Sequence, residues 1–333
     1  MDLDVVFLGT AGSVPTAQRA PASVLLRRGG DRLLMDCGEG TQRQLLRSSV
    51  GLVELDDVLL THFHLDHVLG LPGMLKTFAL RGRELPLTVH GPRGLRDLFG
   101  ALRPLLGRLP YPLTLVELEP GEAIERAGWR VEAFAVEHRS VALGYALVEE
   151  ARPGRFDLDA ARSLGVPEGP LWGALQRGES VTTPTGDVVE PSQVLGEARA
   201  GRRVVVTGDT RPTRSVLEAS IGADVLIHEA TFSEEERERA IETAHSTAAE
   251  AAEMARLAGV DLLALTHVSS RYFGSELARE ARAVFPETVV PRDFDVIEVP
   301  FPERGRPTLH RGAASGRPAG SQDPPAPADG AAG

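Results

Sequence analysis

The sequence predicts an α/β fold in which helices cover a sheet. Short apolar runs rich in valine and leucine alternate with segments of helical periodicity, such as 247–258 and 276–284. Elements that alternate in this way pack as layers of strands and helices. Several apolar runs stop abruptly at polar residues, so we expect loops suited to chemistry to converge at one edge of the sheet.

The expected strands lie at 58–60, 134–136, 204–206, 225–227 and 262–265. Short apolar runs of this kind are typical of strands that are buried on both faces. The residues that follow them are, in the same order, Thr61 and His62, Glu137 and His138, Thr207 to Asp209, His228 and Glu229, and Thr266 and His267. Histidine and carboxylate side chains therefore recur at the strand ends.

Composition is that of an ordinary globular protein, with 42% hydrophobic and 25% charged residues among 333. This length permits one large domain or two. The one cysteine, Cys37, excludes an internal disulfide framework and a cysteine-rich zinc module, and we expect it to be a small buried thiol. A net charge of −11 gives no general attraction to nucleic acid, so any polyanion must be bound locally.

The two ends of the chain differ in character. The first four residues, Met1 to Asp4, lack a basic region and a long apolar segment, so we expect neither a secretory signal nor a membrane span, and a cytoplasmic location. From about Arg304 the chain turns to glycine, proline, alanine and serine. The sequence therefore predicts a folded body over 1–303 and a disordered tail over 304–333.

The densest motif is His62-Phe63-His64-Leu65-Asp66-His67, with three imidazoles and a carboxylate in six residues. Imidazoles so close together would compete for buried hydrogen-bond partners, which favours a metal site over a structural role. Strand ends also present His138, Asp209 and His267, and a catalytic metal needs such sequence-distant ligands. Seven nitrogen and oxygen donors without thiolates suit two metals; they favour zinc, and manganese, cobalt or iron remain compatible.

With these motifs in place, the chain resembles the metallo-β-lactamase superfamily and, more narrowly, the ribonuclease Z family of tRNA 3′-processing endonucleases. The resemblance implies an αβ/βα four-layer sandwich with an inserted flexible arm. Besides the histidine-rich loop, the motifs that carry it in the family's order are 7–15, 36–42, 208–210, 228–231 (His-Glu-Ala-Thr), 245–247 (His-Ser-Thr) and 266–272, which contains Ser-Ser-Arg-Tyr.

The resemblance also implies a ligand set of two Zn²⁺ per subunit. The first zinc would be held by His62, His64, His138 and Asp209, and the second by Asp66, His67, the bridging Asp209 and His267. Two such cations can orient a bridging water and stabilise charge on a phosphodiester. Asp66 would orient or deprotonate that water, although a helix N-cap is the alternative role for an aspartate there.

Further site residues follow from the remaining motifs. Thr247 to Glu250 has the spacing of a capping box, which places His245 near a helix N-terminus. There His245 could hold the scissile phosphate or protonate the departing ribose oxygen, and the resemblance supports the acid role. Glu229 would orient His245 and favour its protonated form. The residues expected to bind substrate phosphates are Ser269, Ser270 and Arg271, for which ordinary loop capping is the alternative.

A glycine- and proline-rich segment at about 152–196 is expected to be the arm. Its Gly-Pro element lies at 165–179, and in the family this arm binds the tRNA elbow, often across a homodimer. On sequence alone, a long linker is equally compatible. Its basic residues Arg152, Arg155, Arg162 and Arg177 are diluted by nearby carboxylates.

The expected function is a zinc-dependent endoribonuclease that cuts precursor tRNA after the discriminator base and leaves a tRNA 3′-hydroxyl. Alternatives are a hydrolase of small phosphodiesters, because the superfamily fold supports many reactions, and an RNA-binding scaffold with an inactive site. One motif departs from the family: Pro15 to Ala20 keeps the proline and Arg19 of the P-x-K-x-R-N loop but lacks its lysine and asparagine. The sequence therefore does not decide whether the enzyme discriminates against CCA-bearing precursors. It also does not decide between endonuclease and trimming modes.

Overall fold

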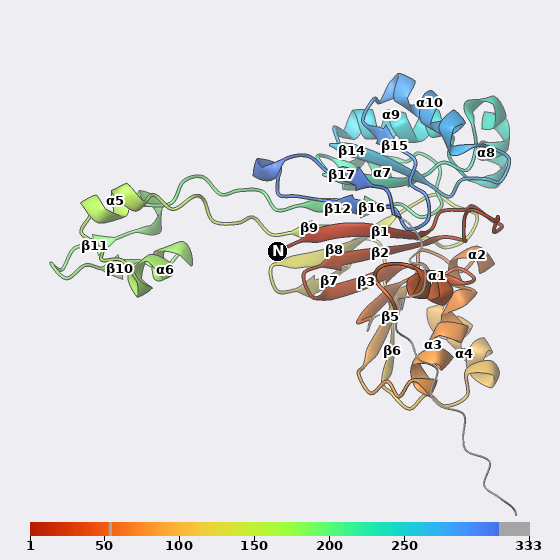
Figure 1. The fold of residues 1–333 in the computed structure, drawn as a ribbon, viewed down its shortest axis with the longest axis horizontal. Helices are drawn as coiled ribbons and strands as arrows, with labels where there is room; N and C mark the ends of the chain where they lie inside the picture. Colours follow the sequence, from red (N-terminus) through yellow and green to blue (C-terminus); the bar gives the residue numbers. More distant parts are fainter. Residues whose placement is uncertain (53–54, 313–333) are drawn as a thin grey trace, which may run out of the picture.

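The computed structural model describes residues 1–52 and 55–312, and it confirms the four-layer α/β sandwich (Figure 1). An eight-stranded sheet has the order β17-β16-β1-β2-β3-β4-β5-β6. Its strands are β1 (Leu3–Gly9), β2 (Ser23–Arg28), β3 (Asp31–Met35), β4 (Asp57–Leu59), β5 (Leu87–Gly91), β6 (Leu113–Glu117), β16 (Val296–Glu298) and β17 (Thr308–His310).

A seven-stranded sheet, β15-β14-β13-β12-β9-β8-β7, packs against the first. Its strands are β7 (Ala123–Arg126), β8 (Trp129–Ala135), β9 (Leu143–Glu149), β12 (Arg203–Val206), β13 (Val225–Glu229), β14 (Leu262–Thr266) and β15 (Thr288–Val289). Strands β3 to β6 are parallel, and so are β12 to β15. Their carboxyl ends therefore meet at one edge of each sheet, as the strand-end pattern predicted.

Successive side chains of a strand point to opposite faces of the sheet, so each strand contributes to two layers. In β1, for example, Val5 and Phe7 face the core between the two sheets, whereas Val6 and Leu8 face the helices on the outside. Helices α1 (Thr41–Arg47), α3 (Gly70–Leu80) and α4 (Leu95–Leu106) cover the first sheet, and the alanine-rich α9 (Ala248–Ala258) and α10 (Gly274–Val284) cover the second. Shorter helices are α2 (Leu65–Val68), α7 (Arg214–Ser220) and α8 (Arg237–Thr243).

The arm is a small unit that extends away from the sandwich (Figure 1). It contains α5 (Leu158–Ser163), α6 (Pro170–Gln176) and the hairpin β10 (Val181–Thr182) and β11 (Val188–Val189), which enclose their own apolar cluster. The arm leaves the end of β9 and returns at the start of β12. Since β12 runs from the arm toward Asp209, the arm lies at the end of the sandwich opposite to the loops that carry the predicted ligands.

Part of the segment predicted as tail belongs to the body. Strand β17 pairs with β16 through Val296 and His310, so the first sheet continues past Arg304. This strand is short and polar apart from Leu309, which packs against the core, and composition alone therefore gave little sign of it. The rest of that segment, 313–333, lies outside the described residues. Among the residues that are described, no helix is long and apolar enough to cross a membrane.

Candidate metal centre

The structure brings all seven predicted ligand residues together at the strand ends. Three of the loops involved follow β8, β12 and β14, and the fourth runs from β4 into α2. Three groups form, within each of which the candidate ligand atoms lie within 4.8 Å of one another. The first group is His62, His64, His138 and Asp209, and the second is Asp66, His67 and His267. The third, Asp209, His245 and His267, overlaps the first two.

Asp209 belongs to the first group and also approaches two histidines of the second. Its Oδ2 is 3.7 Å from Nε2 of His62 and 3.4 Å from Nε2 of His67, and its Oδ1 is 3.4 Å from Nε2 of His267. Oδ2 of Asp66 lies 3.3 Å from the same His267 nitrogen. A carboxylate that approaches imidazoles of both groups could be shared by two cations.

The centre fits a divalent cation on its own hydrogen-bonding evidence. Nε2 of His62 and Oδ1 of Asp209 are buried and have no hydrogen-bond partner among the residues that the structure describes. Leaving such atoms unsatisfied costs about 1–3 kcal/mol each. A cation among these atoms would satisfy both, and a donor set of nitrogen and oxygen suits zinc and its first-row neighbours.

Most of the imidazoles are oriented by a bond on the far side of the ring. Nδ1 of His67 donates to Asp36, Nδ1 of His138 donates to the Ala244 carbonyl, and Nδ1 of His267 lies 2.8 Å from the Thr231 hydroxyl. Because that hydroxyl donates to Glu229, its oxygen accepts from His267. These bonds leave each Nε2 atom free to face the centre, which is the usual arrangement around a metal.

Asp36 is a site residue that the sequence reasoning missed. Its Oδ2 accepts hydrogen bonds of 2.8 Å from Nδ1 of His67 and from the Thr61 hydroxyl, and its Oδ1 accepts from the Thr61 backbone. Asp36 and His267 both have positive φ, 57° and 56°, an uncommon conformation outside glycine that marks functional turns. The available signal was a carboxylate directly after a buried strand, but only the fold brings it to His67.

Charge in the centre is set by burial and by these pairings. Burial alone would raise the pKa of Asp209, but the neighbouring His267 and His67 hold that pKa well below its usual value. For His67, burial favours a lower pKa, and the facing carboxylates of Asp209 and Asp36 instead raise it well above the usual value. The excess negative charge that draws a proton to His67 equally favours a cation.

His245 and Glu229 form a pair beside the ligands. Oε1 of the fully buried Glu229 lies 2.8 Å from Nδ1 of His245. Burial lowers the pKa of His245, but the charge and hydrogen bond of Glu229 outweigh it and raise the pKa to about 9. The predicted capping box from Thr247 to Glu250 is confirmed and opens α9 directly after His245. Arg211 donates to the His245 carbonyl and pairs with Glu250, which ties this loop to the helix.

The three residues expected to bind phosphates lie on the loop that follows His267. Arg271 is 40% exposed and pairs with Glu236 at 3.1 Å, and the Tyr272 hydroxyl contacts the same carboxylate. Ser269 and Ser270 line a pocket beside the centre. Phosphate binding by these residues stays a prediction, and Arg271 would have to exchange Glu236 for a phosphate.

Comparison with known proteins agrees with this fold. Residues 17–267 match the Metallo-beta-lactamase superfamily. The chain is 50% identical to Ribonuclease Z of Gemmatimonas aurantiaca, across 91% of this chain and 98% of that protein. It is 45% identical to Ribonuclease Z of Methanosarcina acetivorans, across 90% and 99%. The crystal structure of human tRNase Z, short form, matches with a TM-score of 0.65 and 28% identity, across 89% of this chain and 99% of that one.

The fold is that of the metallo-β-lactamase superfamily, which implies a divalent-metal site, and the histidine and aspartate clusters at the strand ends are the candidates for it. Within that superfamily, the chain belongs to the ribonuclease Z family.

We expect Asp36→Asn to weaken metal binding about 10- to 100-fold. The NH₂ group of the asparagine would face the donor groups of Thr61 and His67, so the His67 ring would no longer be held in place. Competition with a chromogenic chelator measures this affinity. Asp57→Asn is the control: Asp57 pairs with another imidazole, His90, away from the centre. Equal metal affinity in wild type and Asp36→Asn would contradict the prediction.

Proposed function

We propose that this chain is a metal-dependent endoribonuclease that removes the 3′ trailer of precursor tRNA. It cuts after the discriminator base and leaves a tRNA 3′-hydroxyl. The proposal rests on one observation above all: seven imidazole and carboxylate groups converge in a chain that is 50% identical to a Ribonuclease Z. The buried Cys37 suits a reducing compartment, and we place the enzyme in the cytoplasm.

The metals in this proposal are two zinc ions per subunit. The residues that would hold the first are His62, His64, His138 and Asp209, and those that would hold the second are Asp66, His67, Asp209 and His267. When bound, such cations lower the pKa of water toward neutrality and stabilise negative charge on the phosphate.

Asp66 is the residue that we assign to proton acceptance. Burial raises the pKa of Asp66, but hydrogen bonding and charge from His267 and His67 lower it below its usual value, so the carboxylate is ionised. Its Oδ2 also accepts a 2.9 Å hydrogen bond from the Ser13 backbone, which fixes its orientation. An ionised, fixed carboxylate can align a water and take its proton.

His245 is assigned the opposite task, donation of a proton to the departing 3′-oxygen. Glu229 keeps the imidazole protonated, and backbone and side-chain bonds from Thr210 and Thr231 hold that carboxylate in place. The His245 side chain is 12% exposed, so its ring can reach substrate. A general acid of this kind typically contributes about 10²- to 10⁴-fold in rate.

The position of the arm supports action across a homodimer. The seven-residue strand β9 separates the arm from the metal centre by about 20 Å, and the arm extends further away (Figure 1). RNA held at the tip of an arm is thus directed away from that subunit's own metals. Arm arginines pair locally, Arg162 with Glu168 and Arg177 with Glu179, so recognition by shape is favoured over a strong basic patch.

The experiment that tests the function is cleavage of a 3′-extended pre-tRNA, with the product ends mapped to single nucleotides. We expect the metal-loaded wild type to cut after the discriminator, and Asp66→Ala to lose this activity because no carboxylate aligns the water. Well-folded, metal-loaded wild type that turns over bis(p-nitrophenyl) phosphate but leaves RNA intact would instead indicate a small-substrate phosphodiesterase.

Glu229→Gln should lower kcat and move the alkaline limb of the pH–rate profile to lower pH. His245 donates only when protonated, and losing the Glu229 charge lowers its pKa, so the acid is depleted at lower pH than in wild type. The decrease in kcat should be large for RNA and small for bis(p-nitrophenyl) phosphate, because the leaving group of that compound needs no proton. Equal losses on both substrates would argue against the acid role.

Mixing two inactive proteins tests the arm and the dimer together. One is Asp66→Ala with its arm intact, and the other lacks residues 153–198, replaced by a short Gly-Ser linker. We expect pre-tRNA cleavage to return on mixing, because a mixed dimer has one arm and one intact metal centre on different subunits. The matched control carries Asp66→Ala in both proteins. No recovery by subunits that exchange, followed by size-exclusion chromatography, would contradict action across the dimer.

A further inference from the structure

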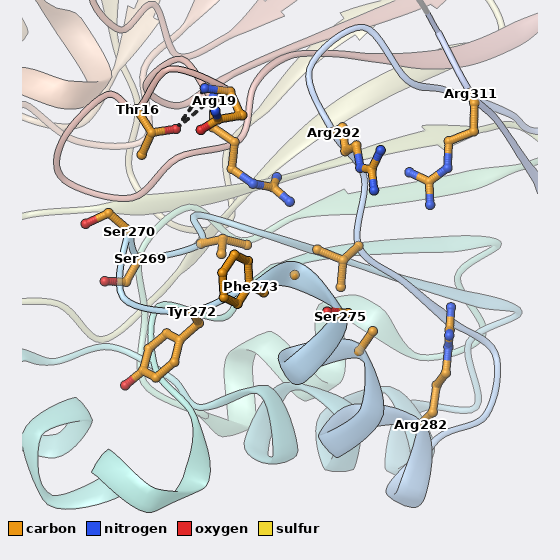
Figure 2. A pocket seen from close by; sticks show the side chains of 15 residues that line it. Thr16, Arg19, Ser269, Ser270, Tyr272, Phe273, Ser275, Arg282, Arg292 and Arg311 are labelled. Carbon is orange, nitrogen blue, oxygen red and sulfur yellow. Dashed lines mark hydrogen bonds between the residues drawn. The ribbon is translucent and has the colours of Figure 1, made fainter.

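A pocket rich in arginine opens beside the metal centre. It has a volume of about 540 Å³, and four guanidinium groups reach it from different segments (Figure 2). We call it the arginine pocket and define it by Arg19, Arg282, Arg292 and Arg311. Of the residues within 1–52 and 55–312, no aspartate or glutamate lines it, in a protein where acidic residues outnumber basic ones by 47 to 36. Such a local excess of cations favours an anionic ligand.

All four guanidinium groups keep donors for a ligand, but Arg19 and Arg311 are more firmly held than the other two. Arg19 is anchored by bonds to the Thr10 hydroxyl and the Pro291 carbonyl, and Arg311 pairs with Asp295. Arg282 uses only its Nε, which donates to the Thr288 carbonyl, and within the described part of the chain the Arg292 side chain has no hydrogen bond or ion pair. Arg282 and Arg292 are exposed and point toward the same space in Figure 2.

The pocket also presents an aromatic ring. Phe273 is 76% exposed, and in Figure 2 it lies near Arg19, with Arg282 toward the opposite side of the pocket. Its backbone N–H donates to Glu276 at the start of α10, which fixes the residue while the ring stays uncovered. Cations beside a free aromatic face are the combination that binds single-stranded nucleic acid, with phosphates on the cations and a base on the ring.

The walls of the pocket connect it to the catalytic centre. One wall contains Thr16 and Arg19, on the loop where the Ser13 backbone donates to Asp66. The other wall begins at Val268 and Ser269, directly after His267. A strand that crosses the metal centre can therefore continue into the arginine pocket.

We propose that the arginine pocket binds the single-stranded trailer downstream of the cut, with Arg282 and Arg292 on its phosphates and Phe273 against a base. This inference rests on the proposed function. Upstream of the cut, a single unpaired discriminator joins the paired acceptor stem, and a duplex does not fit a pocket of the size that usually takes small ligands. Downstream, the trailer is unpaired, and its backbone suits arginine donors.

The test compares two pre-tRNAs with the same body, one with a single-nucleotide trailer and one with a longer unpaired trailer. Wild type should have the higher kcat/KM on the longer trailer. In the double variant Arg282→Ala/Arg292→Ala, this preference should fall about tenfold. The slope of log kcat/KM against log salt concentration should also flatten, by about 0.7 for each phosphate contact removed. Phe273→Ala should also reduce the preference, and Phe273→Tyr should retain it, because a tyrosine ring still stacks.

Arg279→Ala is the matched control, since Arg279 is an exposed arginine of the same helix that does not line the pocket. It should keep both the trailer preference and the salt slope of wild type. Failure of wild type to cut either RNA would overturn the proposed function itself. Cleavage of both RNAs with a trailer preference unchanged in the double variant would overturn only the pocket proposal.

Free anions share the chemistry of the trailer, so inorganic phosphate is a separate arm of the test. Phosphate should compete with the longer trailer in wild type. If phosphate instead alters cleavage of the single-nucleotide substrate in wild type but not in the double variant, the pocket serves a free anion and the trailer proposal is overturned.

Discussion

Keeping one buried carboxylate charged is the constraint on which the site depends. A lone carboxylate in a protein interior is so unfavourable that it normally takes up a proton. Asp209 stays ionised because His67 and His267 face it, and those rings are themselves oriented by Asp36 and Thr231. The attraction between opposite charges thus fixes the rings in the orientation that a cation requires, before any cation binds.

The sandwich supplies the positions that this arrangement needs. Each sheet contributes a parallel half, and the loops from both halves meet at one edge. Asp36 follows a strand of the first sheet and His267 a strand of the second, and both turn into the centre through a left-handed backbone. Strain of this kind costs on the order of 1–3 kcal/mol per residue and is sustained by well-packed strands on either side. Rigid layers behind the loops therefore do much to set the geometry.

Much of this could be predicted from the sequence, and the limits are physical. The apolar runs that stop at histidine or aspartate predicted the strand ends, because a run and the residues that follow it are local features of the sequence. The α/β layering then predicted that the seven residues converge, because loops at one edge of a sheet lie close together. The partners Asp36 and Thr231 are ordinary residues until the fold brings them to His67 and His267. The pairing of Arg271 with Glu236 depends on two loops meeting. Strand β17 was missed because its short, polar run carries almost no local signal.

The separate apolar cluster of the arm has a consequence for how such proteins change over time. Because the arm encloses its own core and joins the body through two extended segments, it can lengthen, shorten or be lost without disturbing a single residue of the metal centre. In the proposed function, bond cleavage and the capture of RNA by the arm are thus encoded in separate parts of the chain. Changes in the arm would then alter how RNA is held while the residues of the metal centre stay the same.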